Sequence, residues 1–182
     1  MKTLPSNFEL DRYGLHVRLV REDDAAYIVR LRTDPKLGRY IHHTDPDVGK
    51  QIAWLKEYKK REQQGLDYYF VFESPKGCPC GLLRIYDIAD DYFTIGSWVF
   101  DMNAPKGAAI LADIITKEIG FELFPEKKVH WDNMKENLNV LRHTRTYHPT
   151  LIRETETQMF FEGTHVDFEK YKQIYLRMYI TN

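Results

Sequence analysis

The sequence predicts an α+β fold in which a central mixed, mostly antiparallel twisted sheet of about seven strands is flanked by helices. Three observations lead to this prediction. The 182 residues suffice for one domain with a sizeable core and are few for two. Three aromatic or β-branched runs follow one another between residues 68 and 100, as in an antiparallel meander. Segments with helical spacing of apolar residues lie before and after them, without internal repeats or low-complexity tracts.

The first expected elements are a strand and two helices. Apolar and polar residues alternate over 15–19, which predicts a strand. The acids at 22–24 favour the start of a helix that ends before Pro35, because the residue before a proline disfavours helical backbone. A second helix is expected over 47–64, with one apolar face made by Ile52, Leu55 and Tyr58.

The middle of the chain predicts the meander and a central helix. Strands are expected over 68–73 and 80–88, joined by the turn residues 74–77, and a third strand over 92–100. An apolar helix follows the turn after Phe100 and ends near residue 124.

The last third predicts a strand over 128–132, a helix from about 137 to 147 and two strands over 150–154 and 158–162. Thr164 and Asp167 have the spacing of a helix capping box, which predicts a terminal helix. We therefore expect a single domain over residues 1–182, with a core of about 13–163 and a C-terminal helix of about 165–178.

The composition argues against several classes of partner. Lysine and arginine number 26 against 27 aspartates and glutamates, so the formal net charge of −1 favours neither nucleic acid nor an anionic membrane. No stretch approaches the roughly 18 to 20 apolar residues that cross a bilayer, and the N-terminus lacks a secretory apolar region, so a cytoplasmic location is expected. Cys78 and Cys80 are separated by one residue, which fits neither a zinc knuckle nor a redox pair, and no metal is expected.

The strand over 95–100, the small-residue turn after it and the helix that begins near residue 107 form one pattern. This order places unpaired backbone N–H groups and the positive end of a helix dipole at the turn, where a phosphate group would be stabilised. Close packing of small residues at a helix start is the alternative explanation of Gly107-Ala108-Ala109.

Three short segments, together with the order of elements, resemble a known family. They are Leu19 to Asp24, Gly81 to Asp87 and Gly96-Ser97-Trp98. Over about residues 13–163 the chain resembles the GNAT superfamily of N-acetyltransferases, in the branch that includes ribosomal-protein and amino-sugar acetyltransferases. The resemblance implies the GNAT acyl-CoA N-acyltransferase fold, acetyl-CoA as co-substrate and direct attack by a primary amine in a ternary complex.

The resemblance also implies cofactor-binding residues. Backbone groups of Trp98, Val99 and Phe100 would hold the pantetheine arm, and the turn with Lys106, Gly107, Ala108 and Ala109 would hold the pyrophosphate. The basic residue that usually opens this loop in the family is replaced by Ala104. Asn137 would contact the pantetheine arm, or serve only as a helix cap. Arg142 would contact the phosphates, or be solvated.

The chain departs from the family at the position of the catalytic acid. Thr144 stands where relatives carry a general-acid tyrosine, and its neighbours His143 and Tyr147 are the candidates. We expect Tyr147 rather than His143, with aromatic packing and solvation as the respective alternatives. Asp87, near Asp90 and Asp91, is the candidate base, or part of a solvated hairpin tip.

His42, His43 and Tyr86 are expected to bind the acceptor amine. Together with Trp54 and Trp98, they suit a small amine such as an amino sugar, possibly nucleotide-linked. A protein N-terminal amine, as in ribosomal-protein acetyltransferases, and a catalytically silent acyl-CoA-binding module remain alternatives. The expected partners are acetyl-CoA and the amine, with no nucleic acid and no membrane, in a monomer or homodimer.

Overall fold

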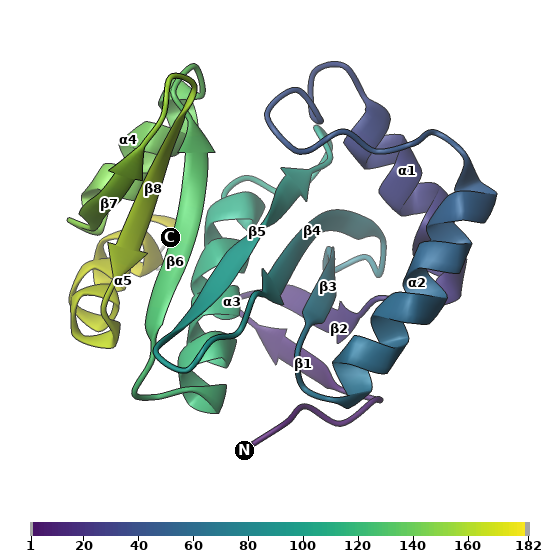
Figure 1. Cartoon of the computed structure of the whole chain (residues 1–182), viewed down its shortest axis with the longest axis horizontal. Coiled ribbons are helices and arrows are strands. Elements are labelled where there is room, and N and C mark those ends of the chain that lie inside the picture. Colours follow the sequence, from purple (N-terminus) through teal and green to yellow (C-terminus); the bar gives the residue numbers. More distant parts are fainter. Residues whose placement is uncertain (1, 181–182) are drawn as a thin grey trace.

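A computed structural model describes residues 2–180. Its sheet has eight strands in the order β1-β2-β3-β4-β5-β6-β8-β7, and of these neighbours only β5 and β6 run parallel (Figure 1). The strands are β1 (Glu9–Arg12), β2 (Leu15–Leu19), β3 (Tyr68–Glu73), β4 (Pro79–Tyr86), β5 (Tyr92–Phe100), β6 (Lys128–Met134), β7 (Thr150–Glu154) and β8 (Gln158–Gly163). The helices are α1 (Ala25–Thr33), α2 (Val48–Gln63), α3 (Ala108–Leu123), α4 (Leu138–Thr146) and α5 (His165–Tyr179). This architecture confirms the predicted fold class.

The sheet has an apolar core on each face. Helices α1 and α2 cover one face, where Leu55 and Tyr58 pack with Tyr69 and Val71 of β3. The other face is covered by α3 with α4 and α5, and there Phe70 of β3 joins the core. Because both faces are covered, β3 is a continuous apolar run rather than an alternating one.

Helix α3 packs closely on β5, and this contact fixes the centre of the molecule. Most of its residues are buried. A Cβ atom on Gly120 would lie 2.4 Å from the ring of Phe93, so only glycine permits this approach. The helix therefore has a fixed position beside β5 and β6.

Two features differ from the prediction. Strand β1 lies at the edge of the sheet, and its mostly polar residues carry no strong strand pattern, so the sheet has eight strands instead of about seven. Strand β6 continues to Met134, beyond the predicted end at Asp132. This extension brings Asn133 and Met134 into the site described below.

The predicted terminal helix is present. The hydroxyl of Thr164 accepts a hydrogen bond from the backbone N–H of Asp167 (3.1 Å), as the capping spacing indicates. Phe168 of α5 packs against Phe121 of α3, with ring centroids 5.6 Å apart. Within residues 2–180, no helix is both long enough and apolar enough to cross a membrane.

Candidate active site

Strands β5 and β6 are paired at one end and diverge toward the other (Figure 1). They pair only between residues 92–94 and 128–130, although β5 continues to Phe100 and β6 to Met134. A cavity of about 800 Å³ opens at this split. Its walls come from β3, β4, β5, β6, β8, α1, α2, α3, α4 and the segment between α1 and α2.

A β-bulge bends β5 beside the cavity. The register with β4 shifts between Leu82 and Arg84, and Ser97 has a left-handed backbone with φ 55°. The next residue, Trp98, donates its indole N–H to the carbonyl of Ala109 (3.1 Å), which ties β5 to the first turn of α3. Ser97 and Trp98 both line the cavity.

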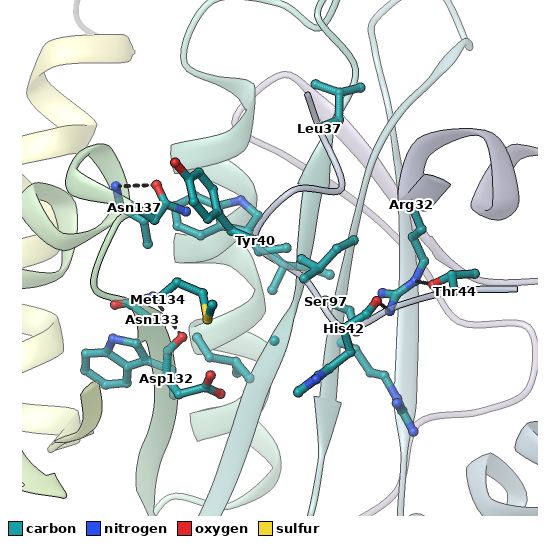
Figure 2. Close-up of a pocket in the computed structure, with 18 of the residues that line it drawn as sticks. Arg32, Leu37, Tyr40, His42, Thr44, Ser97, Asp132, Asn133, Met134 and Asn137 are labelled. Carbon is teal, nitrogen blue, oxygen red and sulfur yellow. Dashed lines mark hydrogen bonds between the residues drawn. The ribbon is translucent and has the colours of Figure 1, made fainter. Parts of the chain in front are cut away.

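The segment between α1 and α2 crosses the mouth of the cavity (Figure 2). Arg32 holds it on one side by a hydrogen bond from Nε to the hydroxyl of Thr44 (2.7 Å). On the opposite side, the hydroxyl of Tyr40 donates to the carbonyl of Glu136, just after β6 (3.5 Å). The segment thus contacts both walls.

The three predicted acceptor-binding residues, His42, His43 and Tyr86, all line this cavity. The guanidinium of Arg84 lies 4.9 Å from the ring centroid of Tyr86 and 5.1 Å from that of Trp54. Arg84 is also paired with the buried carboxylate of Asp67 (Nε to Oδ1 2.7 Å). This wall is therefore aromatic, and the guanidinium that lies over its rings is held by a buried carboxylate.

Asp132, which the sequence analysis did not select, lies in the cavity at the point where β6 has left β5. Burial raises the pKa of its carboxyl above the ordinary value, and the positive charge of a protonated His42 opposes this effect. Gln158 donates to its Oδ2 (3.0 Å). Figure 2 shows Asp132 and His42 on facing sides of the cavity. A carboxylate of raised pKa is a suitable acceptor for a proton from an amine.

The predicted base Asp87 is placed elsewhere. It is exposed at the end of β4, with φ 47°, and does not line the cavity. Asp90 and Asp91 are exposed as well. The structure thus does not bring these acids to the site, and the alternative of a solvated hairpin tip describes them better.

His143 lies in the inner wall of the cavity and is buried, which argues against the alternative that it is solvated. Its Nε2 is 2.9 Å from Oδ2 of Asp113, to which Lys117 also binds (2.6 Å). Burial alone would raise the pKa of Asp113, but Lys117 and His143 outweigh it and lower the pKa to about 2. Burial lowers the pKa of Lys117, and the carboxylate of Asp113 opposes this effect.

Tyr147, the preferred candidate acid, is placed behind this wall. It is buried, it does not line the cavity, and its hydroxyl has no hydrogen-bond partner among the described residues. Burial raises the pKa of this phenol, and the negative charge of Asp113 raises it further. The structure favours the aromatic-packing alternative for Tyr147.

Thr144 has a structural role at the position where relatives carry a tyrosine. Its hydroxyl accepts a hydrogen bond from the indole of Trp131 (3.2 Å) and donates one to Oδ1 of Asn133 (2.7 Å). The threonine therefore links α4 to β6 at the cavity wall.

The expected cofactor-binding residues fall into two groups. Trp98 and Asn137 line the cavity, and Asn137 also caps α4 through a bond from the N–H of Val140 (3.4 Å). The others lie outside this cavity: Val99 and Phe100 at the end of β5, Lys106, Gly107, Ala108 and Ala109 at the start of α3, and the exposed Arg142.

Gly107 has the left-handed backbone expected of a glycine at a close approach, with φ 82°. A Cβ atom here would lie 2.4 Å from the ring of Tyr179, at the end of α5. Tyr179 thus packs against the start of α3, where the sequence analysis expects the pyrophosphate.

Comparisons with known proteins agree with this geometry. A family model described as an acetyltransferase (GNAT) domain matches residues 15–147. A structure titled apo FdhC, a nucleotide-linked sugar GNAT, is 30% identical, with a TM-score of 0.84, over 95% of this chain and 99% of that chain. No curated protein matches the chain.

More distant structures share the fold alone. Mycobacterium smegmatis RimJ in complex with CoA-disulfide is 18% identical, with a TM-score of 0.73, over 91% of this chain and 90% of that one. The ribosomal-protein-S5-alanine acetyltransferase from Vibrio fischeri is 14% identical, with a TM-score of 0.70, over 89% and 99% of the respective chains.

Proposed function

Because this chain belongs to the GNAT acetyltransferase family, we propose that it transfers the acetyl group of acetyl-CoA to the primary amine of a nucleotide-linked amino sugar. The family implies an acyl-CoA co-substrate and an N-acetyltransferase reaction. The nature of the acceptor and the roles of individual residues are our proposal.

The observation that carries the proposal is one continuous cavity that reaches from the split between β5 and β6 to a basic, aromatic mouth. At the split, the unpaired edge of β5 presents backbone groups to the pantetheine arm and to the acetyl carbonyl. Such groups, held in place by the sheet, stabilise the negative charge that develops on the carbonyl oxygen. Both substrates would bind in one cavity and react by proximity.

The mouth of the cavity suits a diphosphate-linked sugar. Basic side chains reach it from α1, from the crossing segment, from α2 and from β4, namely Arg32, Arg39, His42, His43, Lys50 and Arg84. Three of them also have acidic partners: Arg84 pairs with Asp67, Lys50 with Asp45 and Arg39 with Glu136. Arginine recognises phosphate oxygens through paired hydrogen bonds, and aromatic faces such as those of Trp54 and Tyr86 stack on sugar rings and bases. The similarity to a structure titled a nucleotide-linked sugar GNAT supports the same acceptor class.

Asp132 would act as the base for this amine. Its carboxyl has a raised pKa and faces the part of the cavity that we assign to the acceptor. It would take one proton from the ammonium group, leaving a neutral amine to attack the acetyl carbon.

A thermal-shift screen with acetyl-CoA, followed by thiol release with a panel of amines, tests the proposed function. We expect stabilisation by acetyl-CoA and turnover on nucleotide-linked amino sugars. Turnover on N-terminal peptide amines alone would favour the ribosomal-protein type of acceptor. Binding of acetyl-CoA without turnover on any amine would contradict the proposal and favour a silent binding module.

A further inference from the structure

Three ionisable side chains form a buried cluster in the inner wall of the cavity. Lys117 Nζ and His143 Nε2 bind the same oxygen, Oδ2 of Asp113, at 2.6 and 2.9 Å. The three side chains expose only 4 to 8% of their surface. Burying charges is costly even when they are paired, so well-packed apolar residues would often serve stability equally well. The position of this cluster at the cavity suggests a chemical role.

The cluster fixes the tautomer of His143. The lowered pKa of Asp113 keeps it a carboxylate, which only accepts hydrogen bonds. Nε2 of His143 must therefore carry a proton, and in the neutral ring the lone pair is on Nδ1. This Nδ1 is buried and has no hydrogen-bond partner among the described residues. Leaving a buried nitrogen unpaired is unfavourable, and a hydrogen-bond donor that reached it would remove this cost.

The imidazole lies beside the edge of β5 at which we place the thioester. Its ring centroid is 5.3 Å from that of Trp98, whose indole is held by Ala109. Thr144, the next residue on α4, lines the same cavity. His143 is therefore the titratable side chain of α4 best placed to contact the reacting groups.

We propose that His143 shuttles a proton from the attacking amine to the departing sulfur, and that Asp113 and Lys117 are its positioning residues. This inference rests on the proposed function. As the nitrogen–carbon bond forms, the nitrogen passes its surplus proton to Nδ1. As the carbon–sulfur bond breaks, Nδ1 passes that proton to the sulfur. The imidazole of His143 is then neutral again, and the proton that Asp132 took earlier is released to solvent.

Lys117 gives the cluster its resting charge. Its ammonium balances the Asp113 carboxylate, so a neutral imidazole completes a cluster without net charge. The other titratable groups that face the ring are Tyr147 from α4 and Tyr175 from α5. From β5, the ring is faced by the uncharged Trp98. Without Lys117, the unbalanced carboxylate would favour an imidazolium, which has no lone pair on Nδ1 to receive the proton.

The first test removes the imidazole of His143 and measures kcat. The His143→Ala variant should lose about 10²-fold or more in kcat, with the KM for acetyl-CoA changed by less than about threefold. Added imidazole should restore part of the rate. A kcat within about threefold of the wild-type value would overturn the shuttle. Should this variant fail to fold, His143→Gln, which keeps the size and polarity, gives the same comparison without rescue.

The second test compares two buried lysines. Lys117→Met should move the acid limb of the kcat profile to higher pH, because the imidazole lone pair is then lost at higher pH. Lys172→Met is the matched control, since Lys172 is also a buried lysine, is paired with Glu118 (2.8 Å) and Glu169 (2.6 Å) and does not line the cavity. Identical pH profiles for the two variants would exclude the positioning role.

A third measurement is independent of turnover. Nitrogen-15 NMR of the free protein should show His143 protonated on Nε2 and unprotonated on Nδ1, and Asp113→Asn should change that pattern. A proton on Nδ1 of the neutral wild-type ring would refute the inference whatever the acceptor is. Failure of the proposed function would appear differently, as a wild-type enzyme that is inactive on nucleotide-linked amino sugars.

Discussion

The ammonium of Lys117 lies 4.2 Å from the ring centroid of Tyr147, on the side of α3 away from solvent. A cation over an aromatic face is attracted by the ring, and a desolvated pair of this kind gains about 2 kcal/mol. The ring of Tyr147, rather than its hydroxyl, therefore has a structural reason to be present.

The first prediction follows from that contact. Tyr147→Phe keeps the ring and removes a buried hydroxyl that has no partner among the described residues. We expect an unchanged or slightly higher melting temperature and a kcat within about threefold of wild type, because a lone buried polar group costs stability. A loss of about 10²-fold in kcat would make Tyr147 the general acid.

Asn137→Ala separates a helix cap from a ligand contact. Loss of the cap should cost roughly 0.5 to 2 kcal/mol of unfolding free energy, near the low end because the bond to Val140 is long. Calorimetry should also show weaker acetyl-CoA binding, since Asn137 lines the cavity. Thr164→Ala removes a cap from α5 outside the cavity and should leave affinity unchanged. Equal affinities for both variants would make Asn137 purely structural.

Gly107→Glu should abolish acetyl-CoA binding and lower the melting temperature. The new side chain would adopt a left-handed backbone that costs about 1 to 2 kcal/mol, collide with Tyr179 and bring a negative charge to the proposed pyrophosphate site. A Gly107→Ala, Tyr179→Ala double variant makes room for the Cβ atom without adding charge, and it should still bind. A folded Gly107→Glu variant with wild-type affinity would show that the phosphates bind elsewhere.

Asp132→Asn has a pH-dependent consequence. Since burial raises the pKa of Asp132, the folded protein holds this proton more tightly than the unfolded chain does. This tighter proton binding stabilises the fold fully below about pH 3.9, the pKa of an aspartate in the unfolded chain. The stabilisation is lost as the pH rises through the pKa of Asp132 in the folded protein. The melting temperature of the variant should therefore rise relative to that of wild type as the pH increases above about 4.

The same variant should lose about 10²-fold in kcat/KM for the amine if Asp132 is the base. Asp87→Asn provides the comparison, because Asp87 is the acid that the sequence alone suggested. An equal loss of kcat/KM in both variants would make Asp87 a candidate base again. No loss in either variant would mean that the amine binds in its neutral form.

Much of the fold could be predicted because its signals are local. The turn over 74–77 joins two β-branched runs, and Thr164 starts a helix by its own hydrogen bond. Strand β1 was not predicted, because an edge strand with mostly polar residues needs no alternation of apolar residues. His42, His43 and Tyr86 line the cavity, and their role in binding the acceptor stays a prediction that rests on the family resemblance.

The side chains to which we assign catalytic or positioning roles depend on packing that the sequence does not express. Asp113 and Lys117 are spaced like an ordinary surface ion pair on a helix, and only the burial of α3 under α4 and α5 makes them a buried cluster. Asp132 follows an apolar strand, but its role depends on where β6 leaves β5. Such features of tertiary structure explain why the preferred acid and base had to be revised.

The most direct test of the proposed acceptor is the ratio of kcat/KM for a nucleotide-linked amino sugar to that for the same amino sugar without its nucleotide, at saturating acetyl-CoA. The basic mouth predicts a preference of about 10²-fold or more for the linked sugar, the effect of one or two charge-assisted hydrogen bonds to the diphosphate. A ratio near one, or faster turnover of a peptide amine, would contradict the account.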